Sequence, residues 1–183
     1  MLDRRGDCLL NRTPVKRLFL LTLCALSAWA AAPDKIQSSI LNEPNKAALQ
    51  EKKLVFVCFG ASWCGPCRKL HQVLEHDPVK AIWDKHFVTV NVVVDERGDK
   101  AKLNTPKGNE LRRSLGGAEA GIPFFAFLKP DGTKVGDSFD ATGQNIGYPV
   151  TIAEIAVFLK TLEAVAPTMT ASDRKAIEKA LQG

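Results

Sequence analysis

The residues of this chain best suited to chemistry are two cysteines in the segment Trp63-Cys64-Gly65-Pro66-Cys67. An apolar run ends at Phe59, and a helical pattern begins at the cysteines. We therefore expect Cys64 at a helix N-terminus, where free N–H groups and the positive end of the helix dipole favour a thiolate. The thiolate is the nucleophilic form of cysteine, so this position predicts a reactive sulfur.

The spacing of the pair places both thiols on the first helical turn, where a disulfide closes with little motion. We expect Cys64 to face solvent and attack, and Cys67, one turn inside, to resolve the mixed disulfide. Pro66 suits the first turn because its missing N–H would have no helical partner there. Gly65 leaves room for the backbone of a partner to approach. These four residues predict a catalytic dithiol with substrate contacts beside it.

Other uses of the same residues are a structural disulfide or part of a metal site, since zinc sites also use Cys-x-x-Cys. His71 follows Cys67 by four residues and offers a third ligand, so a metal carrier is one alternative. The sequence holds no second pair of this kind, and we expect neither a metal nor an organic cofactor. Cys58 is expected to be a small buried apolar residue.

The first thirty residues have the order of a secretory signal peptide: a basic start, an apolar run over 18–29 and small residues after it. The run falls short of the roughly 20 apolar residues that span a bilayer, which disfavours an uncleaved anchor. Removal of five basic and two acidic residues lowers the net charge from +5 to +2. We expect secretion across the inner membrane to the periplasm. Basic clusters with interleaved aromatics are absent from the sequence, so we expect no nucleic-acid binding.

The remaining chain alternates between strand and helix patterns. Asn45 is expected to cap a helix over 45–53 with Ala48 and Leu49 inward. Strands are predicted at 54–59, 87–94, 124–128 and 133–139, the first two of them central. Further helices are predicted at 68–76, 79–85, 109–115, 151–165 and 170–181, the last two with Thr caps. Residues 95–107 read as an exposed loop whose charge run is solvated.

This order predicts an α/β fold, a mixed sheet with helices on both faces. We divide the chain into a signal peptide (1–30), a lead-in segment (31–44), one domain (45–166) and a C-terminal helical extension (167–183). The extension is most simply an amphipathic cover for the sheet.

With Gly121-Ile122-Pro123-Phe124 downstream, the cysteine segment resembles the thioredoxin superfamily over about residues 45–165. The resemblance implies a thioredoxin fold, a three-layer sandwich around a mixed sheet. It implies that Pro123 is cis beside the cysteines, and that Ile122 and Pro123 help to bind a substrate strand. It also implies that Trp63 is a lid beside the reactive thiol. The stretch 76–79 is more similar to extracytoplasmic domains of the disulfide reductant pathway than to cytosolic thioredoxin.

The sequence departs from thioredoxin at two linked positions. The family's buried Asp falls on Cys58, and its Lys partner falls near Asn91. Both charges are missing together, which avoids a lone buried charge. How Cys67 loses its proton during resolution is therefore open. Gln72 also stands where thioredoxin has a helix-kinking Pro.

We therefore expect an extracytoplasmic protein-disulfide oxidoreductase. Gly65 and Pro66 between the cysteines resemble thioredoxin, which favours reduction of protein disulfides over oxidation. Expected partners are proteins with disulfides or dithiols and a membrane redox donor, and we expect a monomer. The alternatives are a binding or chaperone module without turnover and a disulfide oxidant or isomerase.

Overall fold

The computed structural model describes residues 35–183. The predicted signal peptide and the first part of the lead-in segment lie outside these residues. Within residues 35–183, no helix is long and apolar enough to cross a membrane.

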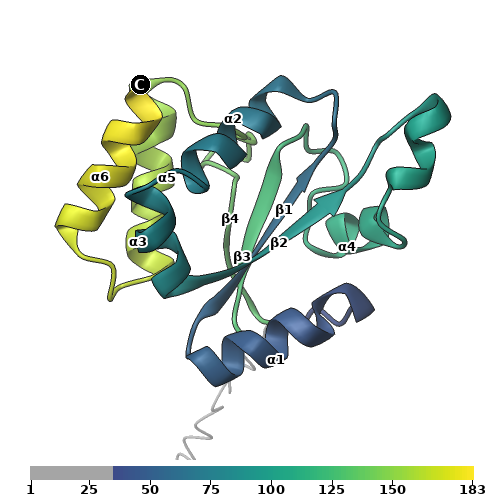
Figure 1. The fold of residues 1–183 in the computed structure, drawn as a ribbon, viewed down its shortest axis with the longest axis horizontal. Helices are drawn as coiled ribbons and strands as arrows, with labels where there is room; N and C mark the ends of the chain where they lie inside the picture. The colour runs from purple at the N-terminus through teal and green to yellow at the C-terminus, as the bar shows by residue number, and fades with distance from the viewer. Residues whose placement is uncertain (1–34) are drawn as a thin grey trace, which may run out of the picture. The chain divides into compact units, whose positions relative to one another are not determined.

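The centre of the fold is a four-stranded sheet in the order β2-β1-β3-β4 (Figure 1). Its strands are β1 (Leu54–Gly60), β2 (Phe87–Val93), β3 (Phe124–Leu128) and β4 (Lys134–Asp137). β1 pairs parallel with β2 and antiparallel with β3, and β3 pairs antiparallel with β4. The predicted mixed sheet is confirmed.

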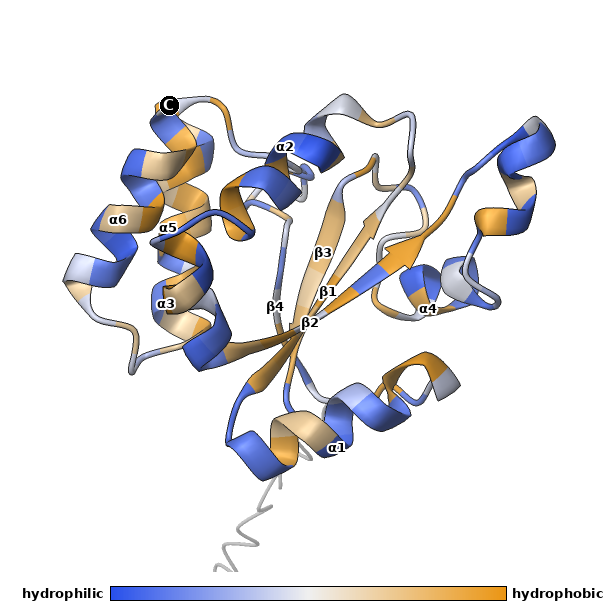
Figure 2. Cartoon of the chain, in the orientation of Figure 1, coloured by the Kyte–Doolittle hydropathy of each residue, from blue (hydrophilic) through white to orange (hydrophobic). Residues whose placement is uncertain are grey.

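Helices cover both faces of this sheet. They are η1 (Ser39–Leu41), α1 (Asn42–Glu51), α2 (Gly65–Leu74), α3 (Val79–His86), η2 (Gly98–Leu103), α4 (Gly108–Ser114), α5 (Ile152–Val165) and α6 (Ala171–Gln182). α1 and α4 pack on one face, and α2, α3, α5 and α6 share the core on the other. Figure 2 shows the apolar strands between the amphipathic helices. The predicted three-layer α/β architecture is confirmed.

β1 is buried on both faces because its side chains alternate between the two cores. Val55, Val57 and Phe59 face α1 and α4, whereas Phe56 and Cys58 face the four-helix side. This double burial explains its continuous apolar run. The strand ends at Gly60, directly before the cysteine segment. The central strand therefore sets where that segment begins.

β2 was predicted as a second central strand, and this is wrong for the sheet formed by residues 35–183. β2 lies at the edge, and Asn91 in it is exposed. Its β-branched residues indicate a strand but carry no information on how many neighbours the strand has.

The helix predicted from Asn45 begins three residues earlier, at Asn42, and no side chain caps it. Pro44 lies in its first turn, where an N–H is not needed. Ala48 is buried as expected, but Leu49 is 69% exposed, so its predicted inward position is wrong.

The segment before this helix is part of the described fold. Ile36 N–H donates to Gly132 O at 2.9 Å, and Leu41 is buried in the α1–α4 core. Ile36 and Leu41 of the predicted lead-in segment therefore contact the rest of the fold.

The caps predicted for the last two helices are confirmed. Thr151 and Glu154 form a capping box at α5, and Thr170 and Asp173 form one at α6. These reciprocal bonds satisfy N–H groups that have no partner inside the helix.

α4 is followed by Gly116 and Gly117. Gly116 has a φ of 90°, the left-handed region that favours glycine. A Cβ at Gly117 would lie 2.4 Å from the ring of Phe124, the first residue of β3. The end of α4 therefore packs directly on the start of β3.

Candidate active site

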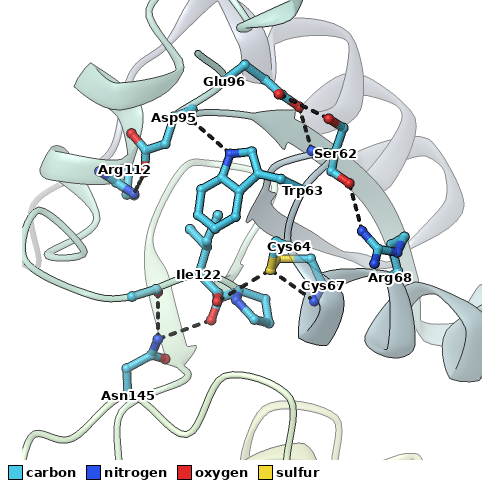
Figure 3. The surroundings of a disulfide bond; sticks show 12 residues. Ser62, Trp63, Cys64, Cys67, Arg68, Asp95, Glu96, Arg112, Ile122 and Asn145 are labelled. Atoms are coloured by element: carbon cyan, nitrogen blue, oxygen red, sulfur yellow. Dashed lines mark hydrogen bonds and ion pairs between the residues drawn. A yellow bond between two sulfur atoms is a disulfide. The ribbon is translucent and has the colours of Figure 1, made fainter. Parts of the chain in front are cut away.

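Cys64 is the N-cap residue of α2 and forms a disulfide with Cys67 (Figure 3). The backbone N–H of Cys67 donates to Cys64 Sγ at 3.1 Å. Pro66 lies in the first turn of the helix, where its missing N–H is tolerated. The predicted helix N-terminus and the pairing of the two sulfurs are both confirmed.

The expectation that Cys64 faces solvent is wrong for this oxidised form. Each cysteine of the pair is only 3% exposed, so exposure does not distinguish the two. The two cysteines differ in the residues that surround them. Cys64 Sγ lies 3.6 Å from Ile122 O, whereas a Cβ at Gly60 would lie 3.2 Å from Cys67 Sγ. Cys67 thus packs against the end of β1, and Cys64 lies toward the segment before β3.

That segment holds the predicted Ile122 and Pro123, and the peptide bond between them is cis, as expected. Asn145 holds it from the loop after β4. Its Nδ2 donates to Gly121 O at 2.8 Å and to Pro123 O at 3.1 Å. Asn145 could not be identified from the sequence, because no pattern links a loop residue to a segment 22 positions earlier.

A pocket of about 640 Å³ opens beside this segment. Its lining includes Pro66, Ile122, Pro123, Phe139, Asn145 and Tyr148. The structure thus brings predicted substrate-contact residues from α2 and from the segment before β3 to one concave surface. Gly65 and Trp63 do not line this pocket.

Trp63 is 54% exposed and is held from the loop after β2. Its Nε1 donates to Asp95 O at 3.0 Å (Figure 3). The ring therefore has a fixed edge beside the cysteines. Its role as a lid stays a prediction.

Glu96, expected in a solvated charge run, is only 5% exposed. Its carboxylate accepts the N–H of Ser62 and, at 3.1 Å, the Ser62 hydroxyl. Asn104 Oδ1 accepts the Glu96 N–H at 2.9 Å, so this hydrogen bond joins two parts of the loop after β2. The prediction of a solvated run is wrong here, because the carboxylate satisfies a backbone donor two residues before Cys64.

The neighbouring Asp95 completes this attachment. It has a φ of 58°, a strained conformation for a residue with a Cβ, and its carboxylate pairs with Arg112 at 2.8 Å.

The sequence contained one signal that residues 95 and 96 lie near the cysteines. Residues 95 and 96 follow a strand parallel to β1, so both strands end at the same edge of the sheet.

Cys58 and Asn91 are register partners on β1 and β2, so these two uncharged residues stand side by side in the sheet. Cys58 is buried as predicted, and its burial raises the pKa of the thiol to about 12. Both residues line a second pocket of about 220 Å³ with Cys67 and His71.

Within residues 35–183, no three His, Cys, Asp or Glu side chains are grouped to hold a metal ion.

We predict that Cys58 is inert in the reduced native protein. The thiolate is the form that reacts with Ellman's reagent. A thiol with a pKa of about 12 holds almost no thiolate even at about pH 9. Thiol counts of wild type and Cys58→Ala should therefore agree under native conditions and differ by one in denaturant. A native count that falls by one in the variant would contradict burial of this thiol.

We predict that Glu96→Ala lowers the free energy of unfolding by about 1.5–3 kcal/mol, because it removes charge-assisted hydrogen bonds to Ser62. Urea denaturation of the oxidised protein measures this change. The control is Glu119→Ala at an exposed loop position, expected within about 0.5 kcal/mol of wild type. Equal losses in the two variants would show that Glu96 makes no special contribution.

Comparisons with known proteins agree with this geometry. A family model described as thioredoxin-like matches residues 36–130, just over half of the chain. Thioredoxin H-type 1 from Nicotiana tabacum is 46% identical over 55 residues, which are 30% of this chain and 41% of that protein. The match therefore spans less than half of that relative's length.

Solved structures of similar fold include a disulphide isomerase from Xylella fastidiosa Temecula1, with 20% identity, 82% of this chain and 96% of that chain covered and a TM-score of 0.47. A thioredoxin from Thermus thermophilus is 28% identical, and the match covers 71% of this chain and 86% of that chain. Its TM-score is 0.46. The match to the family model, together with the mixed sheet and the Cys-x-x-Cys pair at the start of α2, shows that this chain belongs to the thioredoxin-like family.

Proposed function

We propose that this chain is an extracytoplasmic thiol–disulfide oxidoreductase that reduces protein disulfides through Cys64 and Cys67. One observation carries the proposal: the two sulfurs form a disulfide at the N-terminus of α2, and Cys64 Sγ accepts the N–H of Cys67. The same N–H and the helix dipole would stabilise a thiolate on Cys64 after reduction.

The reaction consists of two exchanges. The Cys64 thiolate attacks one sulfur of a client disulfide, forms a mixed disulfide and releases the first client thiolate. Cys67 then loses its proton and attacks Cys64 Sγ, and the second client thiolate leaves with the electron pair of the broken bond. The client gains two electrons, and the Cys64–Cys67 disulfide seen here is the oxidised product.

Client contacts are assigned to Trp63, Gly65, Pro66, Ile122 and Pro123. Pro66, Ile122 and Pro123 line one pocket, and Trp63 exposes its ring beside the cysteines. Cys64 is only 3% exposed in the oxidised form, and Gly65, which has no side chain, follows it, so we assign the approach of the client segment to Gly65.

The direction and the location of the reaction come from the sequence. Gly65 and Pro66 resemble thioredoxin, whose reduction potential is about −270 mV, against about −120 mV for a strong periplasmic oxidant. The N-terminal pattern favours secretion to the periplasm. A reductase in an oxidising compartment needs a donor, and we assign this role to a membrane redox protein. The chain is proposed to act as a monomer.

A second candidate function is a client-binding or chaperone module that retains the motif without turnover. The exposed ring of Trp63 and the pocket beside Ile122 favour it, because both offer apolar contact to an extended segment. It differs from the first proposal in needing no thiol chemistry.

We predict that the protein reduces insulin in the presence of dithiothreitol and that Cys64→Ser lowers the rate to background. Turbidity of the released insulin B chain measures the rate. Cys58→Ala, a matched change at the described cysteine that is not part of the disulfide, should keep most of the activity. Equal rates near background for wild type and Cys64→Ser would remove the enzyme proposal and leave the binding module.

We predict a reduction potential closer to that of thioredoxin, about −270 mV, than to that of a strong oxidant, about −120 mV. Equilibration with glutathione or dithiothreitol buffers, followed by thiol alkylation and mass spectrometry of the Cys64–Cys67 peptide, measures it. A midpoint near the oxidant value would reverse the assigned direction and keep the exchange chemistry.

A further inference from the structure

The pocket behind Cys67 holds side chains that the exchange chemistry described above does not use. Its volume is about 220 Å³, several times the space of one water molecule. It lies between the ends of β1 and β2 and the first turns of α2. Its lining is Cys58, Gly60, Ala61, Ser62, Cys67, Arg68, His71, Asn91, Val92 and Val93.

Cys67 and His71 are four residues apart on α2, so their side chains lie on one face of the helix in successive turns. Both line the same pocket, and His71 is half-buried. The two side chains therefore share one small volume that admits water. An imidazole can take up and release a proton near neutral pH.

The other groups around this pocket cannot accept a proton from a thiol near neutral pH. Cys58 on β1 keeps its own proton, because burial raises its pKa to about 12. Arg68 on α2 stays cationic and donates to Ser62 O at 2.7 Å. β2 contributes only Asn91 and two valines, none of which titrates. Glu96 binds Ser62 but is not part of the lining.

We propose that His71 is the proton acceptor for Cys67 when the mixed disulfide is resolved, and this inference rests on the proposed function. The proton moves from Cys67 Sγ to an imidazole nitrogen of His71, directly or through one water in the pocket. The Cys67 thiolate attacks Cys64 Sγ, the bond from Cys64 to the client sulfur breaks, and the client thiolate leaves with the electron pair. His71 then releases the proton to solvent.

The same residue acts in the reverse direction. When a donor thiolate attacks Cys64 and opens the Cys64–Cys67 bond, Cys67 leaves as a thiolate, and protonated His71 returns a proton to it. His71 thus fills a role that the uncharged Cys58–Asn91 pair cannot fill.

The test follows the two exchange steps separately, with oxidised glutathione as the probe. The full chain carries Cys8→Ser and Cys24→Ser so that only three cysteines remain. Reduced protein is mixed with glutathione disulfide, quenched with acid at intervals, and analysed by mass spectrometry for the Cys64–glutathione adduct. Formation of the adduct reports attack by Cys64, and its decay reports resolution by Cys67.

His71→Gln is expected to leave formation of the adduct unchanged and to slow its decay roughly 100-fold or more near pH 7. The wild-type decay rate should rise with pH less steeply than the rate of His71→Gln. The His71→Gln rate should keep rising about tenfold per pH unit, because hydroxide then takes the proton. The difference between the proteins should therefore shrink at high pH.

His71→Glu separates proton transfer from a structural role. Glu and Gln have the same shape, but only Glu can accept a proton, so His71→Glu should resolve the adduct faster than His71→Gln. His76→Gln, a change outside the pocket, should behave as wild type.

Decay of the adduct at the wild-type rate in His71→Gln would overturn the inference. So would equal slowing in His71→Gln and His71→Glu at every pH, because that pattern indicates packing. If no adduct forms on Cys64 in wild type, the proposed function itself fails. Normal adduct formation with resolution independent of His71 removes only the inference.

Discussion

The hydrogen bond from the N–H of Cys67 to Cys64 Sγ is the interaction on which the site depends. It exists because Cys64 is the N-cap of α2, extended in its backbone, while Cys67 is already helical. The apolar strand β1 delivers the chain to this point and ends at Gly60, which lets Cys67 pack against its backbone. The end of β1 and the start of α2 thus give Cys64 and Cys67 different surroundings.

Two further segments hold the reacting residues from outside this strand–helix unit. The loop after β2 binds Ser62 through Glu96 and Trp63 through Asp95 O. The loop after β4 binds the carbonyls on either side of Ile122 through Asn145. Both attachments use side-chain or carbonyl oxygens and amides rather than apolar packing. The cysteines therefore lie between two polar attachments, and Trp63 is exposed beside them.

Features set by neighbours in sequence could be predicted, and features set by distant pairing could not. The cap at Cys64, the capping box at Thr151 and the buried Cys58 follow from local chemistry and hydrophobic pattern. The edge position of β2 and the burial of Glu96 depend on which elements meet in space. Leu49 shows the same limit, because helical spacing alone does not say which face a helix presents to the core.

The close packing of Gly117 on Phe124 has a consequence for how such a chain can vary. Any side chain at 117 would collide with the ring of Phe124, so alanine there would require this ring at the start of β3 to move. In an alignment of related sequences, position 117 should stay glycine wherever position 124 is aromatic.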